Sequence, residues 1–316
     1  MRQRDPSRPN SILARPKISA LAALVNPAPI LDFVLPGLLS GTAGMIIAPG
    51  ATGKTWLALQ IGIAIAGGLP VCEGVWGAIP ASGKVLVLTW EDPEPAIQGR
   101  LKAIMERLKS RGASESLLHQ IDENIDTRSM HGETAELMDR NGESGPLLDD
   151  LLEAAEGQRL LILDPFARIH RGEERDNGQM TRVISLLEHV AHKTGATVVV
   201  LHHTNKDAAL NGTVDIQQAA RGASALVDNV RWLAALQTMT AAEAESYGID
   251  NVVRKHWVRL AVPKANYTPP LPDSWLRRES GVLVMGDPKR NRDSIARGAE
   301  KYAAASGNGS DYDEIF

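Results

Sequence analysis

The sequence is poor in several features that mark particular classes of protein. Its 316 residues contain one cysteine, Cys72, which excludes an internal disulfide and a cysteine-rich zinc site. No run of about 18 apolar residues occurs, and the N-terminus lacks the continuous apolar core of a signal peptide, so we expect a cytoplasmic protein. The formal net charge is -4, so the surface as a whole does not attract nucleic acid. Any DNA contact must come from a local concentration of lysine and arginine.

Apolar runs that alternate with helical patterns indicate the fold. A hydrophobic content of 43% over this length is enough for one large α/β core. Continuous apolar segments, of the kind that a parallel sheet buries on both faces, recur along the chain with helical spacing between them. They lie at residues 45–48, 84–90, 159–164 and 197–201. We predict an α/β fold with a mostly parallel central sheet, and strands near 256–262 and 281–285 predict an antiparallel C-terminal edge.

Composition predicts three regions along the chain. Residues 1–30 carry arginines interrupted by prolines, which indicates a basic flexible arm that ends in a short helix. Residues 31–286 contain the core patterns and are expected to form the main domain. Residues 287–316 are charged and then rich in glycine and serine, which predicts a disordered tail. Residues 110–146 are polar and hold little pattern beyond one short helix, so we attach no function to them.

The stretch from Met45 to Trp56 carries the strongest functional signal. An apolar strand leads into a glycine-containing loop, and an apolar helix begins at Lys54. This order predicts a phosphate-binding loop, because backbone N–H groups and the helix N-terminus then converge on the phosphates. Lys54 would contact the γ-phosphate and the hydroxyl of Thr55 would ligate Mg²⁺. The residues expected to bind nucleotide are Pro49, Gly50, Ala51, Thr52, Gly53, Lys54, Thr55 and Trp56.

One position departs from the usual phosphate-loop pattern G-x-x-x-x-G-K-[ST]. Ala48 stands where the first glycine is expected. Since alanine can occupy the end of a strand, and Gly50 and Gly53 keep the backbone permissive next to the phosphates, we interpret the loop as functional. A chance Gly-Lys-Thr in a surface turn is the alternative.

Two strand-end acids are candidates for the chemistry of an NTPase. Asp164 ends an apolar strand that we expect beside the phosphate-loop strand, where a carboxylate orders Mg²⁺ through its water shell. Many ATPases carry a catalytic glutamate directly after this aspartate, but Pro165 occupies that place. Glu91, at the end of the strand 84–90, is therefore the best candidate to activate water. A helix-capping aspartate and a solvated turn glutamate are the respective alternatives.

The strand at 197–201 ends in His202 and His203. A pair of metal ligands is one interpretation, but no cysteine or third well-spaced histidine accompanies the pair. We favour a strand-end group that senses the γ-phosphate and moves the next loop. That loop is long, which is typical of a functional segment, and its Lys206 is a candidate for DNA contact. Arg171, in the loop after the Asp164 strand, is a second candidate for DNA contact.

Three further basic residues are candidates for a group that reaches the γ-phosphate of a neighbouring subunit. They are Arg221, Arg231 and Lys264. A residue of this kind would be an arginine finger that acts in trans. A structural ion pair is the alternative for each.

Taken together, these motifs resemble one known family. The segments concerned are Ala48–Thr55, Trp90–Pro93, Leu163–Asp164, Leu201–His203, Arg221–Trp232 and Lys264–Tyr267. In this order they resemble the RepA family of hexameric plasmid replicative helicases, which belongs with the RecA-type ATPases and the DnaB-like ring helicases. The resemblance implies a RecA-like P-loop NTPase core. It also implies a homohexameric ring that binds ATP between subunits and moves 5′ to 3′ on single-stranded DNA.

The resemblance also implies residue roles. It gives phosphate and Mg²⁺ contacts to Lys54 and Thr55, the catalytic carboxylate to Glu91, the metal-side acid to Asp164, and γ-phosphate sensing to His203. It implies that Arg100 and Tyr267 sandwich the adenine and that Arg231 is the finger in trans. DnaB-like helicases carry a Lys-x-Arg pair where this chain has Lys264-Ala265-Asn266, so the arginine role falls to Arg231 or Arg221.

A second function class fits the same nucleotide site. A RecA-type ATPase could act as a nucleotide-gated regulator, or as a DNA-binding filament or recombination mediator, without unwinding. A small-molecule kinase is disfavoured, because no second substrate pocket is apparent. The acidic and apolar tip at residues 311–316 resembles the protein-docking tail of single-stranded-DNA-binding proteins, with a solubilising tail end as the alternative.

Overall fold

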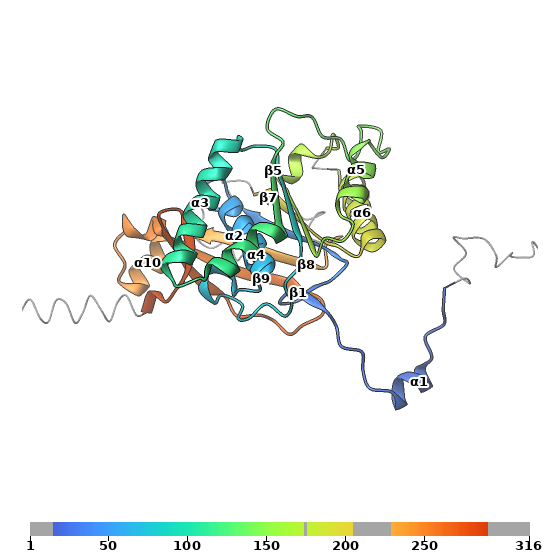
Figure 1. Cartoon of the computed structure of the whole chain (residues 1–316), viewed down its shortest axis with the longest axis horizontal. Coiled ribbons are helices and arrows are strands. Elements are labelled where there is room, and N and C mark those ends of the chain that lie inside the picture. The colour runs from blue at the N-terminus through green and yellow to red at the C-terminus, as the bar shows by residue number, and fades with distance from the viewer. Residues whose placement is uncertain (1–14, 174–175, 205–228, 290–316) are drawn as a thin grey trace, which may run out of the picture. The chain divides into compact units, whose positions relative to one another are not determined.

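The structure is a computed structural model that describes residues 15–173, 176–204 and 229–289 (Figure 1). The chain divides into two compact units, residues 1–32 and 33–316, and each is described by itself. In the first unit, the short helix α1 (Ala20–Val25) begins where the hydroxyl of Ser19 accepts a hydrogen bond from the backbone N–H of Ala22.

The second unit is built on a nine-stranded sheet. Its strands are β3 (Ala43–Ala48), β4 (Val85–Thr89), β5 (Ile125–Ser129), β6 (Leu160–Asp164), β7 (Thr197–His203), β8 (Trp232–Thr238), β9 (Trp257–Ala265), β10 (Ser274–Glu279) and β11 (Val282–Gly286). The strand order is β11-β10-β9-β8-β3-β7-β6-β4-β5. Pairing is parallel from β8 to β5 and antiparallel from β8 to β11. The predicted α/β fold, with its antiparallel C-terminal edge, is confirmed.

Helices cover both faces of the sheet (Figure 1). On one face lie α2 (Lys54–Gly67), α3 (Glu94–Ser110) and α4 (Glu115–Asn124), and on the other lie α5 (Leu147–Ala154) and α6 (Asn177–Thr194). The remaining elements are the hairpin of β1 (Phe33–Leu35) with β2 (Leu38–Leu39), the helix α10 (Ala241–Tyr247), and the 3-10 turns η2 (Val71–Glu73), η3 (Phe166–Arg168) and η4 (Val253–His256). None of the described helices is both long and apolar enough to cross a membrane.

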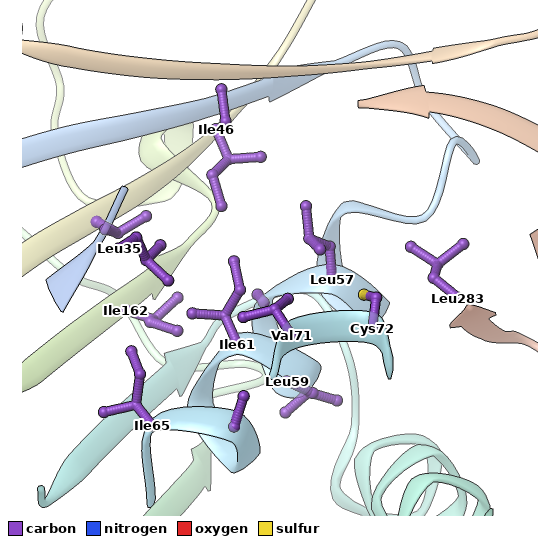
Figure 2. Packing of buried hydrophobic residues seen from close by; sticks show 14 of the residues in the cluster. Leu35, Ile46, Leu57, Leu59, Ile61, Ile65, Val71, Cys72, Ile162 and Leu283 are labelled. Atoms are coloured by element: carbon purple, nitrogen blue, oxygen red, sulfur yellow. The ribbon is translucent and has the colours of Figure 1, made fainter. Parts of the chain in front are cut away.

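Alternation along the strands divides the core into two layers. Ile46 of β3 packs in the cluster that contains α2, whereas its neighbours Met45 and Ile47 pack in the cluster that contains α6. Successive strand residues point to opposite faces, so each buried strand supplies both layers. Figure 2 shows the first layer, where Ile46 and Ile162 of the sheet face Ile61 and Ile65 of α2.

Three features of the fold differ from the sequence predictions. The strand β5 lies in residues 110–146, where the sequence shows little pattern, and β10 lies in the connection expected between two strands. The strand β6, which ends in Asp164, is not beside the phosphate-loop strand, because β7 lies between β3 and β6. Local patterns do not encode the order of strands in a sheet, which depends on long-range pairing.

Candidate nucleotide site

The phosphate loop lies where β3 meets α2, at the carboxyl edge of the parallel strands. Gly53 ends the loop with a φ of 106°, a left-handed conformation that favours glycine, and α2 follows at Lys54. A cavity of about 380 Å³ opens beside the loop. It is lined by the loop and the first turn of α2, by the two residues that follow Trp90 after β4, by the last residue of β7, by one side chain of α3, and by the β10–β11 hairpin. Ligands of open α/β sheets gather at this edge.

Thr55 and Asp164 meet directly behind the phosphate loop. The Thr55 hydroxyl donates a hydrogen bond to Oδ2 of Asp164 over 2.6 Å. Asp164 is 3% exposed, and this burial raises the pKa of its carboxyl, against the hydrogen bond from Thr55 and the charge of Lys54, which both lower it. A hydroxyl beside a carboxylate is the oxygen donor set that Mg²⁺ prefers, so these two residues fit the ion. The structure brings them together even though β6 and β3 are not neighbours.

Lys54, His203 and Glu91 form a chain of polar contacts across the mouth of the cavity. The Lys54 ammonium lies 2.9 Å from Nδ1 of His203, and Nε2 of His203 lies 3.4 Å from Oε2 of Glu91. An ammonium can only donate, so Nδ1 accepts and the ring proton belongs on Nε2, toward the carboxylate. Burial lowers the pKa of Lys54, while the charges of Asp164 and Glu91 oppose that shift. The predicted lysine, sensor and carboxylate are thus within reach of one another.

The two strand-end histidines point to opposite faces of β7. His203 lines the nucleotide cavity, whereas His202 is buried on the other face, with its ring centroid 5.8 Å from that of Phe166. Adjacent residues of a strand cannot bind one ion together from opposite faces. The described residues also contain no group of three or more His, Cys, Asp or Glu side chains that could hold a metal. The interpretation of this pair as metal ligands is therefore wrong.

Arg100 lies at the cavity, but its guanidinium is already engaged. It donates to both carboxylate oxygens of Asp92, over 2.5 and 2.9 Å, and lies 5.9 Å from the centroid of the Trp56 ring. Tyr267 lies just beyond the end of β9, whose residue Ala265 pairs with Trp232 at the start of β8. This is the opposite edge of the sheet from the phosphate loop. Arg100 and Tyr267 of one chain therefore cannot sandwich the same adenine, and the sandwich implied by the resemblance stays a prediction for a site between subunits.

The candidate finger residues Arg231 and Lys264 lie near Tyr267. Arg231 precedes β8 and its carbonyl accepts a hydrogen bond from the N–H of Asn266, while Lys264 pairs with Leu233 across the β8–β9 ladder. The intervening strand β3 spans about 16 Å, at about 3.3 Å per residue. These residues are thus well separated from the phosphate loop of their own chain.

The DNA-contact candidates are only partly described. Arg171 is half-exposed, and its Nε lies 3.8 Å from Oε1 of Glu136. The other DNA-contact candidate, Lys206, lies outside the described residues, as do the finger candidate Arg221 and the tip at 311–316.

Two residues of the site were missed by sequence analysis. Arg278 of β10 donates from Nη2 to the carbonyl of Ala51, over 3.0 Å, and to the carbonyl of Thr52. Gly281, with a φ of +92°, packs so closely that a Cβ there would lie 2.3 Å from the ring of Trp56. No local pattern marks either residue, since both reach the loop through strand pairing more than 200 positions along the chain.

This sheet, with a phosphate loop at its carboxyl edge, defines a P-loop α/β protein with a RecA-like fold, and solved structures agree. One solved ATPase domain aligns with a TM-score of 0.51 and 13% sequence identity, over 78% of this chain and 86% of that domain. A DnaB-like replicative helicase aligns with a TM-score of 0.52 and 13% identity, over 78% of this chain and 59% of the helicase. Residues 9–209 match the family model AAA_25, described as AAA domain, and the chain belongs to this family.

Proposed function

We propose that this protein is an ATP-driven replicative DNA helicase, similar to the plasmid RepA family, that moves 5′ to 3′ on single-stranded DNA. The observation that carries the proposal is the contact chain Lys54–His203–Glu91 beside the Thr55–Asp164 pair. It unites a phosphate-loop lysine, a carboxylate and a histidine that touches both. Such a histidine can respond to the state of the nucleotide and is followed directly by the candidate DNA loop.

Each residue of the site has a defined task in hydrolysis. Lys54 and the loop amides would hold the β- and γ-phosphates of ATP, and Glu91 would accept the proton of the attacking water. Thr55 and Asp164 would hold Mg²⁺, which neutralises charge on the phosphates when bound. His203 contacts both Lys54 and Glu91, so a phosphate that draws Lys54 away would alter the contact of His203 with Glu91.

The separation of Arg231 and Lys264 from the phosphate loop of their own chain supports catalysis between subunits. In our proposal Arg231 reaches the γ-phosphate bound by a neighbour, with Arg221 and Lys264 as the alternatives. A closed homohexamer would let every site receive a finger. Tyr267 would then contact only a nucleotide bound by the adjacent subunit.

Contact with DNA would run through phosphates. In our proposal Lys206 and Arg171 line a basic channel, and single-stranded DNA binds there without sequence preference and with strong salt dependence. The tip at residues 311–316 would dock a replication or single-stranded-DNA-binding protein. Both ideas depend on local charge, since the net charge of the chain is -4.

Steady-state ATP hydrolysis with and without single-stranded DNA tests the proposal. We expect DNA to stimulate hydrolysis, Lys54→Ala to abolish it, and Glu91→Gln to lower it by about a hundredfold or more while ATP still binds. A strand-displacement assay on a fork with a 5′ tail, compared with a 3′ tail, then tests unwinding and its direction. Hydrolysis that ignores DNA would contradict the helicase and favour the regulator or filament former. Absence of ATP binding by the wild-type protein would refute both.

A further inference from the structure

The β10–β11 hairpin places an arginine directly on the phosphate loop. Nη2 of Arg278 donates to the backbone carbonyls of Ala51 and Thr52. These residues belong to the loop whose N–H groups would face the phosphates. Arg278 also lines the cavity beside the loop, together with Lys54 and Thr55.

The hairpin is fixed to the helix that follows the loop. The Gln60 side chain of α2 donates to the carbonyl of Leu283, over 2.7 Å, and accepts from the N–H of Leu283, over 2.9 Å. Arg107 of α3 donates to Glu279, the residue after Arg278, over 2.7 Å. The glycine at 281 also lets the turn lie against Trp56. Arg278 is thus held in place by a rigid frame, not by a free loop.

Arg278 has no carboxylate partner among the described residues. Its neighbour Arg277 pairs with Glu279, but no described acid lies within ion-pair distance of Arg278 itself. The contacts to Ala51 and Thr52 both use Nη2, which leaves the N–H groups of Nη1 and Nε for another acceptor. Arg278 is partly buried, and this burial lowers its pKa, so its charge is incompletely solvated at the cavity. A guanidinium in this position is suited to an anion with several oxygen atoms.

We propose that Arg278 is a nucleotide-binding residue that acts in cis: it holds the phosphate loop through the carbonyls of Ala51 and Thr52 and donates its remaining N–H groups to the triphosphate. This inference rests on the proposed nucleotide function. It gives the triphosphate a second cation from the same chain, besides Lys54, because Arg100 is already paired with Asp92. The cation from a neighbouring subunit would then be needed for hydrolysis, not for binding.

A glutamine at position 278 distinguishes the contact of Arg278 with the phosphate loop from its proposed contact with the triphosphate. Arg278→Gln keeps an amide that can donate to a loop carbonyl but removes the charge and the planar fork. We expect it to bind ATP about tenfold to a hundredfold more weakly than the wild type, with an unchanged thermal midpoint in the absence of nucleotide. Inorganic tripolyphosphate should compete with a fluorescent ATP analogue on the wild type, and this competition should weaken by a similar factor in the variant.

Two further variants complete the test. Arg277→Gln changes the adjacent, exposed arginine of the same strand and should bind ATP as the wild type does. Arg278→Lys keeps the charge and should recover most of the affinity that glutamine loses. The inference fails if Arg278→Gln binds ATP and tripolyphosphate as tightly as Arg277→Gln, or if lysine recovers nothing. If the wild type itself binds no ATP, or Lys54→Ala binds as well as the wild type, the proposed function fails instead.

Discussion

The buried histidines on the far side of β7 should make the stability of the fold depend on pH. His170 and His202 are each 6% exposed and both pack against Phe166, with ring-centroid distances of 4.6 and 5.8 Å. Burial lowers the pKa of each imidazole from 6.5 to about 4. The folded protein therefore keeps both rings neutral at a pH where the unfolded chain would protonate them.

The sign of the effect follows from this difference. Between pH 6.5 and about 4 the unfolded chain binds more protons than the folded one, so stability falls as the pH falls through this window. Each unit of pKa difference corresponds to about 1.4 kcal/mol, and integration from pH 8 to pH 5 gives about 2 kcal/mol for each histidine. The pair would remove about 4 kcal/mol, which is a large part of the stability of a typical domain.

Denaturant unfolding at pH 8 and pH 5, followed by circular dichroism, measures this loss. We expect His170→Gln to lose about 2 kcal/mol less than the wild type over this interval, since one titrating group is gone. Only the pH dependence is compared, so any constant cost of the glutamine cancels. The matched control is His189→Gln on α6, whose side chain is exposed. An equal loss in His170→Gln and the wild type would refute the reasoning.

Two further predictions concern the frame of the site. Gln60→Leu should lower the free energy of unfolding by about 1–3 kcal/mol, because the backbone of β11 loses its buried hydrogen-bond partner. The control Gln98→Leu, on the exposed side of α3, should change the free energy of unfolding little. Equal effects of the two variants in chemical denaturation would contradict this prediction. Gly281→Ala should lower the melting temperature by displacing Trp56, whereas Gly99→Ala, in open space on α3, should raise stability by about 0.5–1 kcal/mol; calorimetry of both checks the contrast.

The parts of the fold that the sequence predicts are those with a strong local signal. Strands β3, β4, β6 and β7 are continuous apolar runs because both of their faces are buried, and such runs are visible without any partner. The strand β5 could not be found in this way. It is a short edge strand with the sequence Ile-Asp-Thr-Arg-Ser and partly exposed side chains, so burial imposes no pattern on it.

The residues of the site also differ in whether a local sequence signal marks them. Glu91 and His203 were predicted at strand ends, and parallel strands bring their carboxyl ends to one edge, so their presence at the edge that holds the phosphate loop follows from the parallel sheet. The contacts of His203 with Lys54 and Glu91 depend on the strand order as well. Arg278 could not be predicted, because its position depends on the register of β10 against β9, where Arg277 pairs with Trp257. Tyr267 was assigned to the adenine through the resemblance, and the direction of β9 places it at the other edge.

Topology also separates ATP binding, which one chain can perform, from ATP hydrolysis, which needs two chains in our proposal. Lys54 and Arg278 meet the phosphate loop within one chain, whereas Arg231 lies at the opposite edge of the sheet. If both proposals hold, dilution to monomers should leave ATP binding nearly unchanged and abolish hydrolysis. Mixing Lys54→Ala with Arg231→Ala should restore part of the hydrolysis, because some interfaces then combine an intact loop with an intact finger. Hydrolysis that stays proportional to protein concentration down to the monomer range would place the catalytic cation within the chain, and Arg278 would be the first residue to test in that role.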